Sequence, residues 1–302
     1  MLIAGFPAGS FAANCYLVAP AAGEECVIID PGQDAEPGIN EIVERYRLRP
    51  AGVVLTHGHL DHIWSVVPVC GARNIAAYIH PADRALLTDP ASGLPLRAGQ
   101  QLLRGLTFTE PDDVVELADG MTLDLAGVPL VVGHAPGHTP GSVTFRLPAA
   151  ADPGTLFSGD LLFAGSIGRV DLPGGDYATI LGSLARVCLP LRDDTVVLSG
   201  HGPQTTIGAE RATNPYLAGL APSGGPASFP DPARPGTRPA AGSGPAGAAR
   251  PARPRCRRSR PRRRAPERPR SRGQWPPSRR RRRARRRTAG SARRCRPSWS
   301  PG

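Results

Sequence analysis

Short apolar runs recur along the chain up to residue 198 and predict β-strands, because many are rich in β-branched residues and bounded by turn residues. They cover residues 2–6, 15–19, 25–30, 52–55, 75–79, 114–117, 121–125, 129–132, 143–147, 155–158 and 195–198. Helical spacing of apolar residues appears at 37–47, 61–70, 81–88 and 177–189, and weakly at 209–217. Strands in adjacent runs with helices between the runs indicate packed sheets covered by helices, an α+β or layered α/β fold.

The pattern stops after Leu220, where the composition changes abruptly. Residues 1–220 contain 12 arginines and 23 acidic residues, a net charge of −11, whereas residues 221–302 contain 25 arginines and two acidic residues, Asp231 and Glu267. The second segment has almost no aliphatic residue larger than alanine, so it cannot bury enough apolar surface to offset chain entropy. We therefore predict one folded domain over residues 1–220 and a disordered Arg/Pro/Ala/Gly-rich tail over residues 221–302.

The basic tail has two interpretations. Its densest block, Arg279–Arg283 with Arg285–Arg287, is typical of segments that bind polyanions non-specifically by counterion release or of nuclear and nucleic-acid patches. The alternative is an extension without function, since Arg, Pro, Ala and Gly are what GC-rich codons give in an unintended reading frame. We favour the second interpretation, because the tail shows no pattern of a folded module with stacking aromatic residues.

The six cysteines are scattered and form no C-x-x-C pair, so neither a disulfide framework nor a cysteine zinc site is indicated. Reduced thiols favour a cytoplasmic protein. The N-terminus lacks the basic region of a signal peptide, and no apolar stretch reaches the length of a membrane span. We expect no membrane partner, and the sequence leaves the oligomeric state open.

The candidate chemistry begins with a polar cluster directly after the apolar run 51–55. It reads Thr56-His57-Gly58-His59-Leu60-Asp61-His62. Alternate residues of an extended segment point the same way, so His57 and His59 can reach one point, while Asp61 and His62 can face a second point nearby. Imidazole and carboxylate together suit zinc, iron or manganese. A histidine-rich loop without metal is the alternative, but burying these groups unpaired would be costly.

Further polar residues end other predicted strands and stand in turns, where sheet proteins commonly place their sites. His138 lies in Ala135-Pro136-Gly137-His138-Thr139-Pro140-Gly141-Ser142, Asp160 follows the run 155–158, His201 lies in Ser199-Gly200-His201-Gly202, and Asp30 ends the run 25–30. We expect Asp30 to support the site from behind rather than to bind metal.

These motifs, T-H-x-H-x-D-H, G-H-T-P-G-S, G-D and G-H-G-P in that order, resemble the metallo-β-lactamase superfamily and within it the glyoxalase II-type (hydroxyacylglutathione hydrolase-like) hydrolases. The resemblance spans roughly residues 2–218 and implies a four-layer αββα sandwich with two divalent metal ions, zinc first, with iron or manganese as alternatives. It implies that three residues hold the first metal, three the second, and one bridges them: His57, His59 and His138; Asp61, His62 and His201; and Asp160.

The resemblance implies hydrolysis of a small-molecule thioester by a hydroxide that bridges the two metals. Asp61 would also act in catalysis by orienting this nucleophile. A thioester suits such a site, because a leaving thiolate with a free-thiol pKa near 8.5 needs little protonation. Lactones and other activated esters stay open.

Two features bear on the substrate. Arg169, in the segment 165–176 that resembles a substrate-side loop, would either clamp a substrate carboxylate or pair with Asp171 and brace the loop. In addition, only residues 208–220 of the predicted domain follow the last motif, and the chain contains no lysine. The glutathione-binding basic segment of typical glyoxalase II enzymes therefore has no counterpart, and the thiol carrier stays open.

Two other functions compete with the thioesterase. An iron-dependent persulfide dioxygenase on the same fold would bind one iron through His57, His138 and Asp160. A nucleic-acid-binding protein or nuclease would rely on the basic tail, although the predicted folded domain is acidic. Of the other histidines, we expect His80 to cap a helix, and we leave His134 outside the ligand set.

Overall fold

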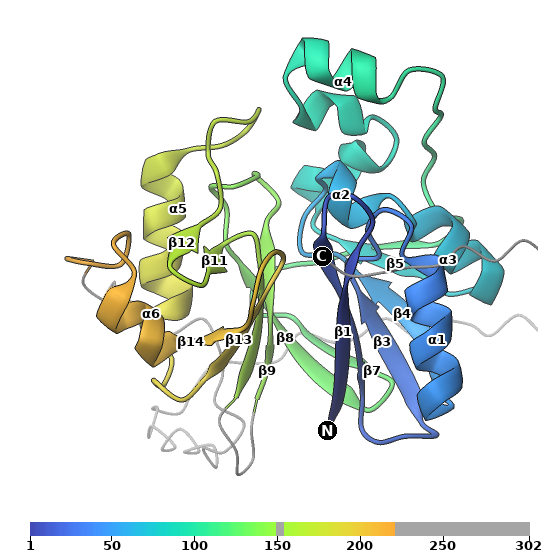
Figure 1. The fold of residues 1–302 in the computed structure, drawn as a ribbon, viewed down its shortest axis with the longest axis horizontal. Coiled ribbons are helices and arrows are strands. Elements are labelled where there is room, and N and C mark those ends of the chain that lie inside the picture. The colour runs from blue at the N-terminus through green and yellow to red at the C-terminus, as the bar shows by residue number, and fades with distance from the viewer. Residues whose placement is uncertain (149–153, 221–302) are drawn as a thin grey trace, which may run out of the picture. The chain divides into compact units, whose positions relative to one another are not determined.

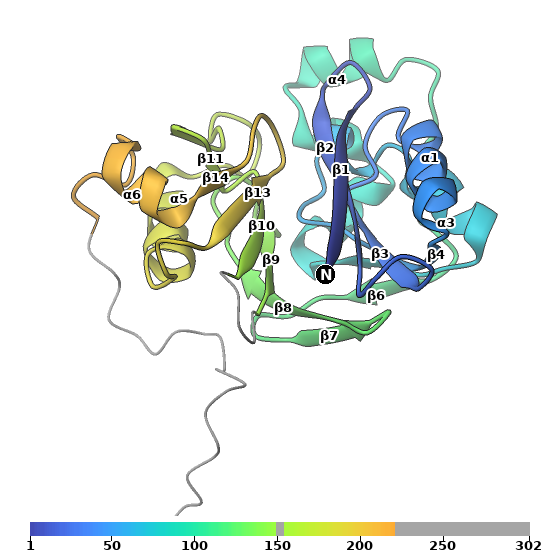
Figure 2. The same ribbon diagram turned by 60° about the horizontal axis from the view of Figure 1, so that its bottom comes forward.

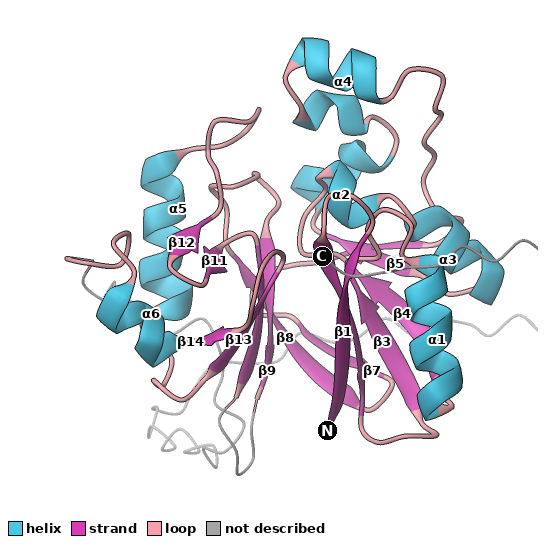
Figure 3. Ribbon diagram, viewed as in Figure 1, coloured by secondary structure: helices cyan, strands magenta, loops and turns pink. Residues whose placement is uncertain are grey.

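The computed structural model describes residues 1–148 and 154–220. Two six-stranded sheets pack face to face, and helices cover the outer face of each sheet (Figures 1 and 3). The predicted αββα arrangement of four layers is therefore confirmed. The predicted disordered tail, residues 221–302, lies outside the described residues, and the domain boundary at Leu220 stays a prediction.

The first sheet has the strand order β1-β2-β3-β4-β5-β6. Its antiparallel part consists of β1 (Leu2–Ala8), β2 (Ala13–Ala19) and β3 (Glu25–Ile29), and its parallel part continues with β4 (Arg49–Val54), β5 (Ala77–Ile79) and β6 (Val114–Glu116). Helices α1 (Glu36–Tyr46) and α3 (Val66–Arg73) cover its outer face (Figure 1).

The second sheet has the order β14-β13-β10-β9-β8-β7. Its strands are β7 (Thr122–Leu125), β8 (Val128–His134), β9 (Val143–Leu147), β10 (Thr155–Gly159), β13 (Val196–Ser199) and β14 (Thr205–Thr206). All neighbours are antiparallel except β10 and β13, which lie side by side in parallel (Figure 2). Its outer face carries α5 (Tyr177–Ser183), the π-helical turn η3 (Leu184–Cys188) and α6 (Ile207–Thr213), and a small hairpin joins β11 (Leu162–Phe163) to β12 (Ser166–Ile167).

The apolar runs are continuous because the central strands are buried on both faces. In β2, Cys15, Leu17 and Ala19 pack with the helices of the outer layer, while Val18 packs between the sheets. Strand β3 divides in the same way: Cys26 and Ile28 pack with the outer helices, while Val27 and Ile29 pack between the sheets. Two-residue alternation thus sorts one apolar run into two separate cores.

The predicted helix 61–70 is in fact two helices, α2 (Leu60–Ile63) and α3. The break lies at the buried Ser65, whose backbone N–H donates to the Pro31 carbonyl at 3.0 Å instead of continuing the first helix. Helix α6 ends before Pro215, consistent with the restricted backbone of a residue that precedes proline. None of the described helices is long and apolar enough to cross a membrane.

The segment between β5 and β6 folds into three short helices rather than one. These are the 3₁₀ turns η1 (Pro81–Leu87) and η2 (Pro90–Gly93) and the unpredicted helix α4 (Leu96–Leu102). They lie beyond α2 at one end of the molecule (Figure 1).

Four strands end at the same edge of the sandwich and position the site. The segments that follow β4, β8, β10 and β13 carry the clustered histidines and aspartates, with Asp61 and His62 in α2. Two backbone bonds connect the two sheets there: Val143 N–H donates to the Thr56 carbonyl at 2.7 Å, and Asn14 N–H donates to the Gly200 carbonyl at 2.7 Å. Ligand-bearing loops from both sheets therefore meet at one place.

Candidate metal centre

Three buried histidines form the first group. Ligand atoms of His57, His59 and His138 all lie within 4.8 Å of one another. Nδ1 of His59 is 2.8 Å from Nε2 of His138, and the rings of His57 and His138 are edge to face with centroids 4.7 Å apart. Three imidazole nitrogens that converge in this way are a common ligand set for zinc.

Asp61, His62 and His201 form a second group with the same spacing limit. Oδ2 of Asp61 is 3.1 Å from Nε2 of His201 and 3.6 Å from Nε2 of His62. The side chain of His62 is fully buried, whereas Asp61 and His201 are 24% and 30% exposed. Solvent and a small ligand can therefore reach the centre from the Asp61 and His201 side.

Asp160 lies between the two groups. Its Oδ1 is 3.5 Å from Nε2 of His62, and its Oδ2 is 3.6 Å from Nε2 of His138 and 3.7 Å from Nε2 of His201. One carboxylate thus faces a histidine of the first group and two of the second. The structure brings all seven predicted ligands together.

The centre has buried polar atoms that lack hydrogen-bond partners among the described residues. They include Nε2 of His57, Nε2 of His62 and Oδ1 of Asp160. An unsatisfied buried acceptor costs free energy that a bound cation would recover. This donor set of imidazoles and carboxylates therefore fits divalent metal ions such as zinc or iron.

Burial and nearby charges lower the pKa values of His57 and His59 and raise that of His62. Burial lowers the pKa of His57 well below its usual value, and burial followed by repulsion from His138 lowers the pKa of His59 to about 3. Burial also opposes charge on His62, but Asp61, Asp160 and Asp30 outweigh it and raise the pKa of His62 to about 10. His57 and His59 are thus neutral and ready to bind metal, while the carboxylates around His62 hold a positive charge that a bound cation would replace.

Partners behind the ligands orient two of the rings. Asp30 Oδ2 lies 3.0 Å from Nδ1 of His62, and the same carboxylate accepts from the Thr56 hydroxyl at 2.6 Å. The Arg169 carbonyl lies 2.7 Å from Nδ1 of His138. A hydrogen bond to Nδ1 leaves Nε2 free for a metal. Asp30 thus lies behind the ligands, as the sequence predicted.

Asp83 supports the centre although no sequence pattern singled it out. It lies in η1, is fully buried, and accepts from Gly58 N–H at 2.8 Å, the Thr139 hydroxyl at 2.7 Å and Gly141 N–H at 2.7 Å. Its position after His80 and Pro81 is typical of an ordinary helix start. Only the contact with two distant loops reveals its role.

Arg169 adopts the second of the two predicted arrangements. Its guanidinium binds both carboxylate oxygens of Asp171 at 2.7 Å, and both side chains are largely exposed. The pair braces the loop whose Arg169 carbonyl orients His138. A contact of Arg169 with substrate stays a prediction.

The remaining two histidines lie apart from the cluster. His80 caps the start of η1, as predicted, because its Nδ1 accepts from Ala82 N–H at 3.3 Å. His134 stacks on His80, with ring centroids 4.1 Å apart and an interplanar angle of 8°, and its Nε2 lies 2.9 Å from the Pro140 carbonyl. Neither belongs to a three-ligand group among the described residues.

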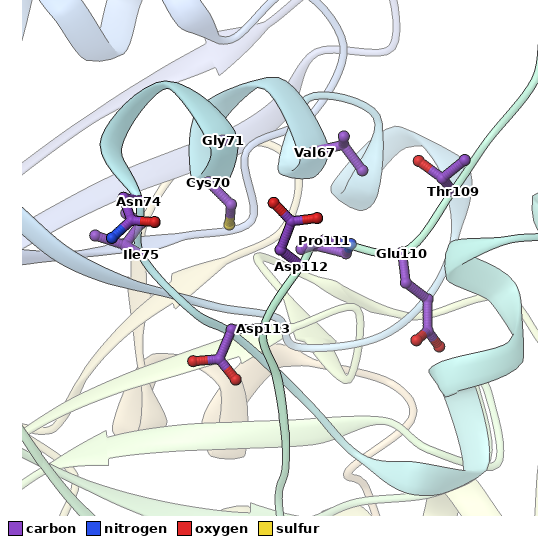
Figure 4. A pocket seen from close by; sticks show the side chains of 10 residues that line it. All are labelled: Val67, Cys70, Gly71, Asn74, Ile75, Thr109, Glu110, Pro111, Asp112 and Asp113. Carbon is purple, nitrogen blue, oxygen red and sulfur yellow. The ribbon is translucent and has the colours of Figure 1, made fainter. Parts of the chain in front are cut away.

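A separate pocket of about 230 Å³ lies beside α3, away from these ligands. Side chains of α3 and its C-terminal end line one side of it, and the segment 109–113 lines the other (Figure 4). Its acidic lining includes Asp112 and Asp113, and the buried thiol of Cys70 has a pKa raised by burial to about 12. None of the seven clustered ligands lines it, so the metal chemistry belongs to the sheet edge.

The family model of the metallo-beta-lactamase superfamily matches residues 8–201, which include every clustered ligand. The chain belongs to this superfamily. Among its relatives in the superfamily is the hydroxyacylglutathione hydrolase GloC of Haemophilus influenzae, 36% identical over 212 residues, which are 70% of this chain and 95% of the relative.

Two solved structures are similar as well. The crystal structure of the B3 metallo-β-lactamase BLEG-1 is 40% identical with a TM-score of 0.63, and the match covers 72% of this chain and 100% of that one. The crystal structure of TTHA1623 in a di-iron-bound form is 41% identical with a TM-score of 0.57, covering 69% of this chain and 97% of that one. The chain is thus similar to these three proteins over nearly their whole length, and its additional length lies outside the matches.

Proposed function

We propose that this protein is a binuclear metallo-hydrolase of the glyoxalase II type that cleaves a small-molecule thioester. The observation that carries the proposal is the pair of three-ligand groups with Asp160 between them. Zinc is the metal we expect, with iron or manganese as alternatives, and the similarity to a di-iron-bound protein supports a site for two metals. Bound divalent ions would lower the pKa of a coordinated water and polarise the substrate carbonyl.

Residues of the chain itself orient the attacking water. Burial opposes ionisation of Asp61, but His62 and His201 outweigh it and hold the pKa of Asp61 below its usual value. Its carboxylate is therefore ionised at neutral pH and can accept a hydrogen bond from the attacking water. Because the Asp61 side is the more exposed part of the centre, we expect the substrate to approach there.

The choice of a thioester has two supports. GloC, which is similar over most of this chain, is named a hydroxyacylglutathione hydrolase. A thiolate with a free-thiol pKa near 8.5 is also a good leaving group without a proton donor, whereas the nitrogen of an amide or β-lactam needs protonation. The thiol carrier and the acyl group stay open, because the chain offers no lysine to bind glutathione.

The test combines metal analysis with activity on one sample of the full-length chain. Metal is measured by elemental analysis, and hydrolysis is followed with S-lactoylglutathione and a simpler acyl thioester. A persulfide with oxygen detection and a chromogenic cephalosporin serve as parallel substrates. We expect two metals per chain and thioester hydrolysis that a chelator removes and added metal restores.

Other outcomes would redirect the proposal. One iron per chain, oxygen uptake with the persulfide and no hydrolysis would identify a dioxygenase. Hydrolysis of the cephalosporin alone would identify a β-lactamase. We also propose that the protein acts in the cytoplasm, in keeping with its free buried cysteines.

A further inference from the structure

A single buried carboxylate connects the segments that carry the first group of histidines. Asp83 accepts from the N–H of Gly58, which lies between His57 and His59, at 2.8 Å. It also accepts from the hydroxyl of Thr139, the residue after His138, and from Gly141 N–H, each at 2.7 Å. The two segments are about eighty residues apart in sequence, so Asp83 is a direct bridge between them.

A different residue connects the last loop to the first sheet. The side-chain amide of Asn14 in β2 donates to the Ser199 and Gly202 carbonyls, each at 3.0 Å, and its backbone N–H donates to the Gly200 carbonyl at 2.7 Å. These three carbonyls flank His201 on both sides. Tyr16 adds a bond from its hydroxyl to the Ser199 carbonyl at 2.8 Å.

The two sets of bonds act on different ligands. Asp83 holds the loops of His57, His59 and His138, whereas Asn14 holds the loop of His201. A metal ligand has to be held within about 0.5 Å of its productive position by the residues around it. Loss of such a support usually lowers metal affinity by about 10- to 100-fold.

We propose that Asp83 and Asn14 are positioning residues that act on separate metal half-sites. Asp83 supports the half-site formed by the first group of ligands, and Asn14 supports the half-site formed by the second group. This inference rests on the proposed function, because it requires a centre with two metals. A difference in affinity between the half-sites would therefore be set by residues that touch neither metal nor substrate.

The experiment measures zinc affinity of each half-site in the full-length, metal-stripped chain, by competition with a chromophoric chelator. The His201→Ala background isolates the first half-site, and the His59→Ala background isolates the second. Asp83→Ala and Asn14→Ala are introduced into each background. Thr139→Val and Tyr16→Phe serve as milder variants with little change in shape. The first removes the hydroxyl bonds of Thr139 to Asp83 and Ser142, and the second removes the one bond of Tyr16 to the Ser199 carbonyl.

We expect a crossed pattern. Asp83→Ala should weaken zinc binding about 10- to 100-fold in the first half-site and less than about threefold in the second, and Asn14→Ala should do the reverse. The milder variants should give smaller losses in the same half-sites. Circular dichroism and the Tm of the metal-free variants serve to check that they fold, and if Asp83→Ala or Asn14→Ala does not, the milder variant decides.

Equal losses in both half-sites, or none, would overturn the inference while leaving the proposed function intact. If the unaltered chain binds two zinc ions, a failure of the crossed pattern concerns the positioning residues alone. If it binds only one, the proposed binuclear function fails first, and the separate support of two half-sites fails with it.

Discussion

At the scale of single residues, the centre combines neutral ligands with a local excess of negative charge. Burial keeps His57 and His59 uncharged, while three carboxylates surround His62. Neutral imidazoles bind metal without first losing a proton, and the carboxylates compensate the charge of a cation. The arrangement is costly without metal, because it leaves buried acceptors without partners.

The first prediction concerns Asp160. Asp160→Ala removes the carboxylate that faces both groups, so metal content and hydrolysis should both fall, by more than the ~10- to 100-fold typical of losing an outer partner. His59→Ala should have a similar effect. Elemental analysis and thioester hydrolysis are the measurements, with circular dichroism as the control for folding. A metal-loaded Asp160→Ala variant that keeps full activity would contradict the placement between two metals.

The second prediction concerns close packing at Gly200. A Cβ added there would collide with Oδ1 of Asp160 and lie 2.8 Å from Cε1 of His62. Gly200→Ala should therefore displace both side chains and lower metal affinity by at least about tenfold, a loss in the range expected for disturbed ligands. The measurement is a zinc titration of the metal-stripped protein.

Gly182→Ala is the matched control for Gly200→Ala. A Cβ at Gly182 in α5 meets nothing within 4 Å, and alanine is favoured over glycine in a helix by roughly 0.5–1 kcal/mol. This variant should bind zinc normally and unfold at a slightly higher temperature. Similar zinc affinities for the two variants would refute the steric argument.

At the scale of elements, the sequence pattern predicted the longer strands but not the short strands β11, β12 and β14 or the division of the helices. Strand β3 has an unbroken apolar run because it faces two cores. A few consecutive residues are enough to recognise such a run. The division between α2 and α3 depends on a bond from Ser65 to Pro31, a contact thirty-four residues away. The short helix α4 likewise has no strong apolar spacing to reveal it.

The third prediction concerns the turn η3 and alkaline pH. Burial raises the pKa of Cys188 to about 12, whereas an unfolded thiol titrates near 8.5. The stabilising effect is complete below about pH 8.5, and it is lost progressively as the pH rises towards 12, because only the unfolded chain releases the proton. Each such thiol should steepen the fall by up to about 1.4 kcal/mol per pH unit.

Urea unfolding at several pH values between about 8 and 11 measures this slope. Cys188→Ala should flatten it, whatever constant cost the substitution adds through its small cavity. The unaltered chain serves as the reference in the same buffers. An unchanged slope would show that this thiol ionises in the folded protein.

At the scale of the whole molecule, charge separates the chain into two unlike parts. The acidic residues 1–220 contain every clustered ligand, and the match of the family model, residues 8–201, lies within this part. The 25 arginines of residues 221–302 suit non-specific binding of polyanions.

The fourth prediction follows from this separation. A chain cut after Leu220 should keep its metal content and its thioester hydrolysis within about twofold of the full-length protein. RNA binding by the full-length chain, if measured, should weaken steeply with salt and vanish on truncation. Loss of hydrolysis on truncation would show that the tail contributes to the enzyme.

The sequence by itself determined a layered fold of sheets and helices and the candidate ligands, and the family resemblance implied the four layers. The apolar runs define the strands, and His57, His59, Asp61 and His62 lie so close in sequence that local geometry already brings them together. Their places in turns and at the ends of predicted strands singled out His138, Asp160 and His201, and the resemblance in motif order implied that they are metal ligands. Such features are local, and each can be recognised from a few consecutive residues.

Only the tertiary structure decided how these ligands are held. Asp83 is an ordinary acid in sequence, and Asn14 an ordinary strand residue, until folding brings each against loops far along the chain. Likewise, only the structure shows that Arg169 pairs with Asp171. Long-range hydrogen bonds leave no periodic trace in a sequence, because their partners are set by the packing of two sheets rather than by spacing along one strand.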